Sequence, residues 1–150
     1  MSYLQYDGKL IRATDRDGNA FTGVAKSLSS GSCLHEYGRE EEGLKIGEHV
    51  LFESTIAGID WVPSYAEAVS AIPPGKYRHF KGNFYEVLCI ARHSETTEPM
   101  VVYRALYGDG GVWTRPALMW NEQVTREGKT FPRFRRVADE KEPAGPGDRG

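Results

Sequence analysis

Cationic and aromatic side chains are interleaved along residues 76–96, whose sequence is KYRHFKGNFYEVLCIARHSET. This stretch holds two histidines, two arginines and two lysines, and its pattern is that of two strands joined by a tight turn at Gly82-Asn83. Guanidinium groups present a planar fork of N–H donors to phosphate, and aromatic rings present flat faces on which bases stack. These residue types therefore favour a site for an anionic ligand that contains a ring.

Strand alternation extends this set to the segments that follow. In MVVYRALYGDGGVWTRP, Trp113 and Arg115 lie two residues apart and so share one side of a strand. We expect the cationic groups to contact phosphate and the rings of Tyr103 and Trp113 to stack on a base. The predicted ligand-binding residues, gathered at one mouth of a small barrel, are His79, Lys81, Arg92, His93, Tyr103, Trp113 and Arg115.

The histidines also permit an enzymatic alternative. His79 or His93, with Glu86 or Glu95 nearby, has the chemistry of a general acid or base. The chain has no HxxxH pair, nucleophile elbow or Gly-rich phosphate loop, and acidic residues 40–42 are expected to form a solvated loop. We therefore expect no catalytic residue, no metal site and no cofactor. Cys89, inside the apolar run VLCIA, is expected to be an inert core residue.

Composition narrows the class of protein. The chain has 150 residues, of which 39% are hydrophobic, and its mean hydropathy is −0.52. No apolar run is long enough to cross a membrane, and the first residues do not resemble a signal peptide. Two cysteines cannot form a disulfide framework, so a reduced, cytoplasmic protein is expected.

Charge is distributed unevenly along the chain. The formal net charge is −2, yet residues 75–137 hold eleven Lys/Arg against six Asp/Glu, a net charge of +5. Residues 1–62 hold six Lys/Arg against ten Asp/Glu, a net charge of −4. The basic half is therefore the half that favours an anionic partner, whereas the acidic total disfavours long duplex DNA.

Short strand patterns separated by Gly-containing turns predict an all-β fold. KLIRATD and AFTGVAKSL form a predicted hairpin around Asp17-Gly18, whereas residues 29–49 are expected to be mostly irregular, with a helical turn near REEE. VWTRPALMW is expected to be one strand. We predict two small barrels in tandem, residues 3–62 and 75–137, joined by a short helical connector at 63–74 and followed by a disordered tail at 138–150.

The second half resembles a known family. The motifs YRHFKG, ARHSET, VVYRALYGDGG, W-x-RP and PRF occur in order between Gly75 and Val137. In this order they are similar to those of the bacterial and phage family called domain of unknown function 1653. The resemblance implies an SH3-like barrel and no established activity.

The first half resembles Sm-like barrels over about 60 residues. GKLIRATDRDGNAFTGVAKSL is similar to the first Sm segment and HVLFESTIAGIDWV to the closing one, while CLHEYGREEEGLKIG resembles a segment of small bacterial Sm-like proteins. RNA-binding Sm proteins carry an Asp-x-x-x-Asn loop and an Arg-Gly pair, where this chain has SSGSC and STIAG. The resemblance therefore implies the fold and not uridine binding at that face.

The leading functional hypothesis is a non-enzymatic binding module whose second barrel holds a phosphate-bearing ligand, either a nucleotide or a short single-stranded nucleic acid. One alternative is a protein–protein interaction or self-assembly module, because small barrels use grooves and strand edges for this purpose. The other is a small nucleotide-processing enzyme that uses His79 or His93. No membrane partner is expected.

Overall fold

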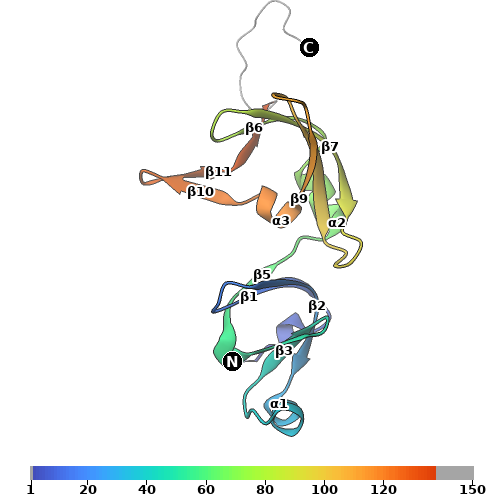
Figure 1. The fold of residues 1–150 in the computed structure, drawn as a ribbon, viewed down its shortest axis with the longest axis vertical. Helices are drawn as coiled ribbons and strands as arrows, with labels where there is room; N and C mark the ends of the chain where they lie inside the picture. Colours follow the sequence, from blue (N-terminus) through green and yellow to red (C-terminus); the bar gives the residue numbers. More distant parts are fainter. Residues whose placement is uncertain (1, 138–150) are drawn as a thin grey trace, which may run out of the picture. The chain divides into compact units, whose positions relative to one another are not determined.

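The structure is a computed structural model that describes residues 2–137. The chain divides into two compact units (Figure 1). Residues 2–63 and 92–98 form the first, and residues 64–91 and 99–137 form the second. Each unit has its own hydrophobic core. None of the helices in the described residues is long and apolar enough to span a membrane.

The first unit is a five-stranded sheet in the order β4-β3-β2-β1-β5, with antiparallel neighbours. Its core is formed by apolar side chains such as Ile11 and Leu44, which are fully buried. Its elements are η1 Leu4–Tyr6, β1 Leu10–Asp15, β2 Ala20–Leu28, α1 Ser30–Tyr37, β3 Gly43–Ile46, β4 His49–Phe52, η2 Glu53–Thr55 and β5 Ile56–Trp61.

The predicted hairpin at Asp17-Gly18 is the β1–β2 turn. Gly18 has a φ of 89°, which only glycine adopts without strain. The Asp15 carboxylate accepts hydrogen bonds from the backbone N–H groups of Asp17 and Asn19, both at 2.9 Å. The bond from the Asn19 backbone is the main reason why the pKa of Asp15 is lowered.

Residues 29–38 differ from the expected irregular loop, because they form a capped helix. The Ser29 hydroxyl accepts from the backbone N–H of Ser32, and Gly38 ends the helix in the left-handed conformation. Ser at the N-cap and Gly at the C-cap are the usual signals of a short helix. The expected helical turn near REEE was therefore placed too late in the chain.

The second unit contains a five-stranded sheet in the order β12-β6-β7-β8-β9 and a separate hairpin, β10–β11. In Figure 1 this hairpin is the orange pair of strands that extends from the end of α3. The elements are α2 Tyr65–Ala71, β6 Gly75–His79, β7 Phe84–Arg92, β8 Pro99–Ala105, β9 Val112–Pro116, α3 Ala117–Trp120, β10 Gln123–Arg126, β11 Lys129–Pro132 and β12 Phe134–Arg136.

The two units share one strand connectivity. Four successive strands pair as neighbours, and the last strand returns to pair with the first: β5 with β1, and β12 with β6. The second unit differs by inserting α3 and the β10–β11 hairpin before its last strand. The all-β class predicted from the sequence is confirmed, although the strand pairs of residues 2–137 do not close either sheet into a barrel.

Helix α2 packs into the core of the second unit. Ala68 and Ile72 are buried there beside Val87 and Val101. A capping box starts the helix, because the Ser64 hydroxyl accepts from the Glu67 backbone N–H and the Glu67 carboxylate accepts from the Ser64 backbone N–H. The segment expected to be a connector thus contributes apolar surface to one unit.

Two details of the second sheet depart from the sequence analysis. In β7, Val87 and Ile90 are buried, three residues apart, whereas Leu88 and Cys89 are exposed. A break in the two-residue period turns Cys89 outward, so its expected core position is wrong. In the segment expected to be one strand, β9 ends at Pro116 and α3 follows, placing Trp120 in the core. The predicted disordered tail lies outside the described residues.

Candidate functional site

Two arginines face each other across the first and last strands of the second sheet. Arg78 on β6 is paired in register with Arg135 on β12, and both side chains are exposed. Like charges directly opposite on antiparallel strands destabilise the pairing. Among residues 2–137, no carboxylate forms an ion pair with Arg78. An anion bound between the two strands would offset this repulsion.

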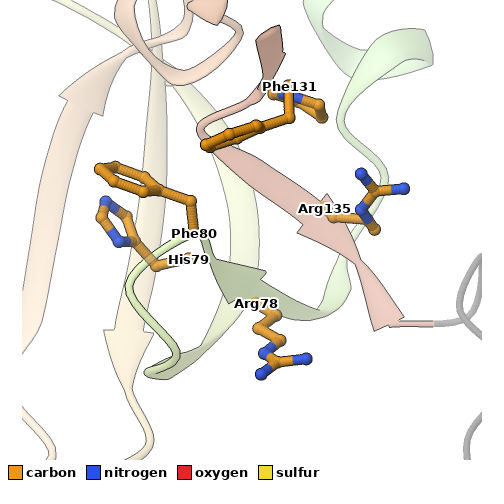
Figure 2. A pocket seen from close by; sticks show the side chains of 6 residues that line it. Arg78, His79, Phe80, Phe131 and Arg135 are labelled. Carbon is orange, nitrogen blue, oxygen red and sulfur yellow. The ribbon is translucent and has the colours of Figure 1, made fainter. Parts of the chain in front are cut away.

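A hollow of about 310 Å³ opens beside this arginine pair (Figure 2). Figure 2 shows the rings of Phe80 and Phe131 and the guanidinium groups of Arg78 and Arg135 at separate points around it. Its volume is at the lower end of the range of small-molecule sites. The hollow, called the basic hollow below, is lined by Arg78, His79, Phe80, Phe131, Pro132 and Arg135.

Phe80 is held in place by a tight turn and by the strand opposite. His79 donates its backbone N–H to the Asn83 carbonyl at 2.8 Å, which closes the turn. The Phe80 backbone N–H donates to the Arg133 carbonyl at 2.9 Å. The Phe80 ring then lies 4.5 Å from the His79 ring and 5.8 Å from the Phe131 ring, measured between centroids. The ring remains partly exposed, as a stacking platform must be.

Three further cations surround the Phe80 ring. The Lys81 ammonium is 5.9 Å from the ring centroid, and the guanidinium carbons of Arg126 and Arg133 are 5.4 Å and 5.8 Å from it. Arg133 also pairs with Glu122 at 3.3 Å. Cations over an aromatic face are attracted to its π electrons. Three cations and the one carboxylate paired with Arg133 thus lie around the Phe80 ring among the described residues, which favours an anion at this end of the unit.

His79 lies between the basic hollow and the hydrophobic core of the second unit. Its Nδ1 accepts a hydrogen bond from the Lys81 backbone N–H at 3.1 Å, so the neutral ring carries its proton on Nε2. Burial, followed by the charges of Arg133, Lys81 and Arg115, lowers the pKa of His79 below its usual 6.5. The ring is therefore neutral at pH 7 and presents one N–H donor.

Tyrosine rings continue from His79 along the core-facing side of the sheet. Tyr85 lies 6.3 Å from His79 and 5.5 Å from both Tyr103 and Tyr107, between centroids. The hydroxyls of Tyr85 and Tyr107 share a hydrogen bond of 2.8 Å. Burial, with that hydrogen bond second, raises the pKa of Tyr85 to about 12. Tyr103 is buried in the core, so it offers no open face to a ligand.

Trp113 and Arg115 lie on the same side of β9. Trp113 pairs in register with Tyr103, and Arg115 pairs with Val101. The Trp113 side chain is nevertheless 60% exposed. The Nε atom of Arg115 is buried and has no hydrogen-bond partner among the described residues. Arg115 is close enough to His79 and Tyr85 for its charge to lower the pKa of both.

The structure brings together some of the seven predicted site residues but not all of them. His79 lines the basic hollow, Lys81 lies beside it, and the charge of Arg115 reaches His79. As described above, Tyr103 belongs to the core and Trp113 is exposed on β9. No single mouth gathers the whole set, so this part of the prediction needs correction.

Arg92 and His93 lie apart from the other predicted site residues. Arg92 is the last residue of β7 and His93 follows it, at the end opposite to the His79 turn; the nine residues of β7 separate its two ends by about 27 Å. His93 is also engaged locally, because its Nδ1 accepts from the backbone N–H groups of Glu95 and Thr96 at 3.0 and 3.2 Å. His93, a predicted candidate for acid–base chemistry, therefore shapes the β7–β8 turn.

Four residues of the basic hollow were absent from the predicted set: Arg78, Phe80, Phe131 and Arg135. Their strands were predicted, in KYRHF and FPRFRR. The missing information was the pairing of β6 with β12. Pairing the first strand with the last, as small barrels do, would have placed Arg78 opposite Arg135.

The first unit has a hollow of its own, of about 540 Å³. Its arginines are already bonded within the protein. Arg39 pairs with Glu41 at 2.9 Å, and the Arg16 Nε donates to the Ser54 carbonyl at 2.9 Å. This hollow is therefore a weaker candidate for an anion. Within residues 2–137, no three His, Cys, Asp or Glu side chains are grouped closely enough to hold a metal ion.

The similarity to known proteins lies in the second unit, which contains the basic hollow. The family model described as DUF1653, a protein of unknown function, matches residues 75–136. A DUF1653 protein from Bordetella bronchiseptica, whose crystal structure is known, shares 42% sequence identity with this chain over the matched region, and the two structures superpose with a TM-score of 0.43. The match covers 46% of this chain and 91% of that one. The comparison with curated proteins gave no match. Through its second unit, the chain belongs to the DUF1653 family.

Proposed function

We propose that the second unit is a non-enzymatic binding module that holds a phosphate-bearing ligand with an aromatic base in the basic hollow. The observation that carries this proposal is the register pairing of Arg78 with Arg135, two like charges on adjacent strands beside two phenyl rings. A phosphate between the guanidinium groups would replace their repulsion with charge-assisted hydrogen bonds.

The other lining groups have complementary roles in this proposal. Phe80 and Phe131 offer faces to a base, because their rings line the hollow and Phe80 is fixed by the Arg133 carbonyl. The Nε2–H of His79 donates to a phosphate or base oxygen. Lys81 and Arg126 lie near Phe80 and attract the anion to this end of the unit.

We further propose that both units are small, partly open barrels, Sm-like in the first half and SH3-like in the second. Their shared connectivity, with the last strand paired to the first, supports this description. A cytoplasmic location is also proposed, because Cys33 and Cys89 are both free thiols.

Calorimetric titration of the full chain with UMP, inorganic phosphate and uridine tests the binding proposal. We expect UMP to bind more tightly than either component, because the phosphate and the base contact different groups. Arg78→Ala should weaken UMP binding about tenfold or more, as expected for the loss of a charged hydrogen bond.

Arg92→Ala is the matched control, since Arg92 is also an exposed arginine of the same sheet but lies at the other end of β7. It should leave UMP affinity within about twofold of the parent value. Equal effects of the two substitutions, or no UMP binding at millimolar concentration, would refute the proposal.

A further inference from the structure

A row of aromatic rings extends from the basic hollow across the sheet to Tyr103 on β8, the strand next to β9. From Phe131 the row passes to Phe80 at 5.8 Å, to His79 at 4.5 Å and to Tyr85 at 6.3 Å. Tyr103 follows at 5.5 Å and is the register partner of Trp113. Directly paired residues have Cβ atoms about 4.5–5.5 Å apart. A series of ring contacts therefore runs from the hollow to Tyr103, and Trp113 is the register partner of Tyr103 on the next strand.

The far end of this row is open to solvent. Trp113 is 60% exposed and Tyr107, which is hydrogen-bonded to Tyr85, is 48% exposed. Tryptophan in a sheet normally buries its large apolar ring, so this exposure leaves a flat surface uncovered. The backbone at Gly111 approaches closely, because a Cβ there would lie 3.2 Å from the Trp113 Nε1. The indole thus lies against the loop before β9.

Cations lie near both ends of this row, although Arg78 and Arg135 are on the face of their strands opposite to His79 and reach the hollow from its edge. Arg115 follows Trp113 on the same side of β9 and is close enough to His79 to affect its protonation. Lys81 and Arg126 lie around Phe80, and Arg78 and Arg135 line the hollow beyond it. A mononucleotide bound in the basic hollow would leave Trp113 and Arg115, at the other end of the row, without a contact.

We infer that the ligand is a single-stranded nucleic acid of several nucleotides, with one base in the basic hollow and a later base stacked on Trp113. This inference rests on the proposed function, which supplies the first binding position. Single strands suit the row because their bases are free to stack, whereas the bases of a duplex are already stacked on each other. Arg115 contacts a phosphate between the two base positions.

Fluorescence anisotropy with labelled octamers of deoxythymidine and of uridine tests this inference, with UMP as the competitor. Affinity for the octamers should exceed that for UMP by tenfold or more. The slope of log affinity against log salt should be at least twice as steep for an octamer, since each phosphate contacted contributes about −0.7. Comparing the two octamers determines whether RNA or DNA is preferred.

Substitution of Trp113 separates the two binding positions. Trp113→Ala should weaken octamer binding about tenfold, from the loss of one stacked base, and leave UMP binding within about twofold. Trp113→Phe retains a ring and should restore much of the octamer affinity. Trp61→Ala is the matched control, because Trp61 is a comparably exposed tryptophan, at 52%, in the first unit. Arg78→Ala should weaken both ligands.

The outcomes distinguish this inference from the proposed function. UMP binding that depends on Arg78, together with octamer binding that is no tighter or is indifferent to Trp113→Ala, overturns the inference and leaves the proposed function intact. Absence of binding by both ligands overturns both. A glutamate octapeptide that competes as well as the nucleic acid octamers shows that charge alone governs binding, which also overturns the inference.

Discussion

His79 is the residue at which the basic hollow and the interior of the second unit meet. Its ring lies against Phe80 at the hollow and against Phe134 in the core, with centroid distances of 4.5 and 4.9 Å. Protonation would place a charge among these rings and beside Arg133, Lys81 and Arg115. The neutral form is therefore the form that the folded state favours.

This preference predicts a pH dependence of stability. Because the pKa of His79 is lower in the folded state than in the unfolded chain, the unfolded chain binds more protons between the two values. The contribution of His79 to the free energy of unfolding should be complete above about pH 6.5 and decline as the pH falls towards the folded pKa. Urea unfolding at pH 7.5 and pH 5.5 measures it.

His79→Gln should reduce this pH dependence, because glutamine does not titrate. An unchanged difference between the two pH values would assign the dependence to other groups. Addition of UMP should raise the pKa of His79 followed by NMR, since a bound phosphate counters the neighbouring cations.

Which of the seven predicted site residues lie close together depends on how far apart they are in the strands. His79, Lys81 and Arg115 were selected correctly as neighbours, because the turn at Gly82 and the alternation in β9 are local features. Arg92 was wrongly grouped with them, since composition does not show which end of a long strand a residue occupies. Arg78 and Arg135 become neighbours only through a pairing of distant strands.

At the scale of elements, β3 and β4 approach closely at Gly43. A Cβ on Gly43 would lie 2.5 Å from the Leu51 carbonyl oxygen, a backbone atom that cannot move without disturbing the strand pair. Gly43→Ala should lower the free energy of unfolding of the first unit by about 1–3 kcal/mol, the usual cost of overpacking. Chemical denaturation checks this value.

Gly58→Ala is the control for that substitution. Gly58 lies in β5 of the same sheet, and nothing is within 4 Å of a Cβ built there. The added methyl group should therefore be tolerated, with a change within about 0.5 kcal/mol. Similar losses for the two variants would show that the contact with Leu51 is not the cause.

Most strands could be predicted from the sequence because their signals are local. The Asp-Gly turn predicts the first hairpin, the turn at Gly82 separates β6 from β7, and residues 108–111 separate β8 from β9. Helix α1 was missed although Ser29 and Gly38 carry its cap signals, since the eight residues between them are mostly polar and show little apolar periodicity. The outward turn of Cys89 depends on the packing of β7 and has no local signal.

At the scale of the molecule, the chain repeats one connectivity around two separate cores. Leu44 and Ile72 are each almost fully buried, one in each core. Leu44→Ala and Ile72→Ala should each cost about 2–5 kcal/mol in the unit concerned. Hydrogen exchange followed by mass spectrometry should locate the loss of protection in the first unit for Leu44→Ala and in the second for Ile72→Ala.

The effects of the double variant should be additive, because the two side chains share no core contacts. Loss of protection spread evenly over both units in each single variant would contradict this expectation and show one cooperative structure.

The return of β12 to β6 has a consequence for biosynthesis. Arg78 and Phe80 leave the ribosome about fifty residues before Phe131 and Arg135, which at ordinary translation rates is a delay of roughly 3–11 s. During that interval the nascent chain already contains β6 to β9 but cannot form the basic hollow. The basic hollow is therefore complete only when the final strand of the unit has been translated.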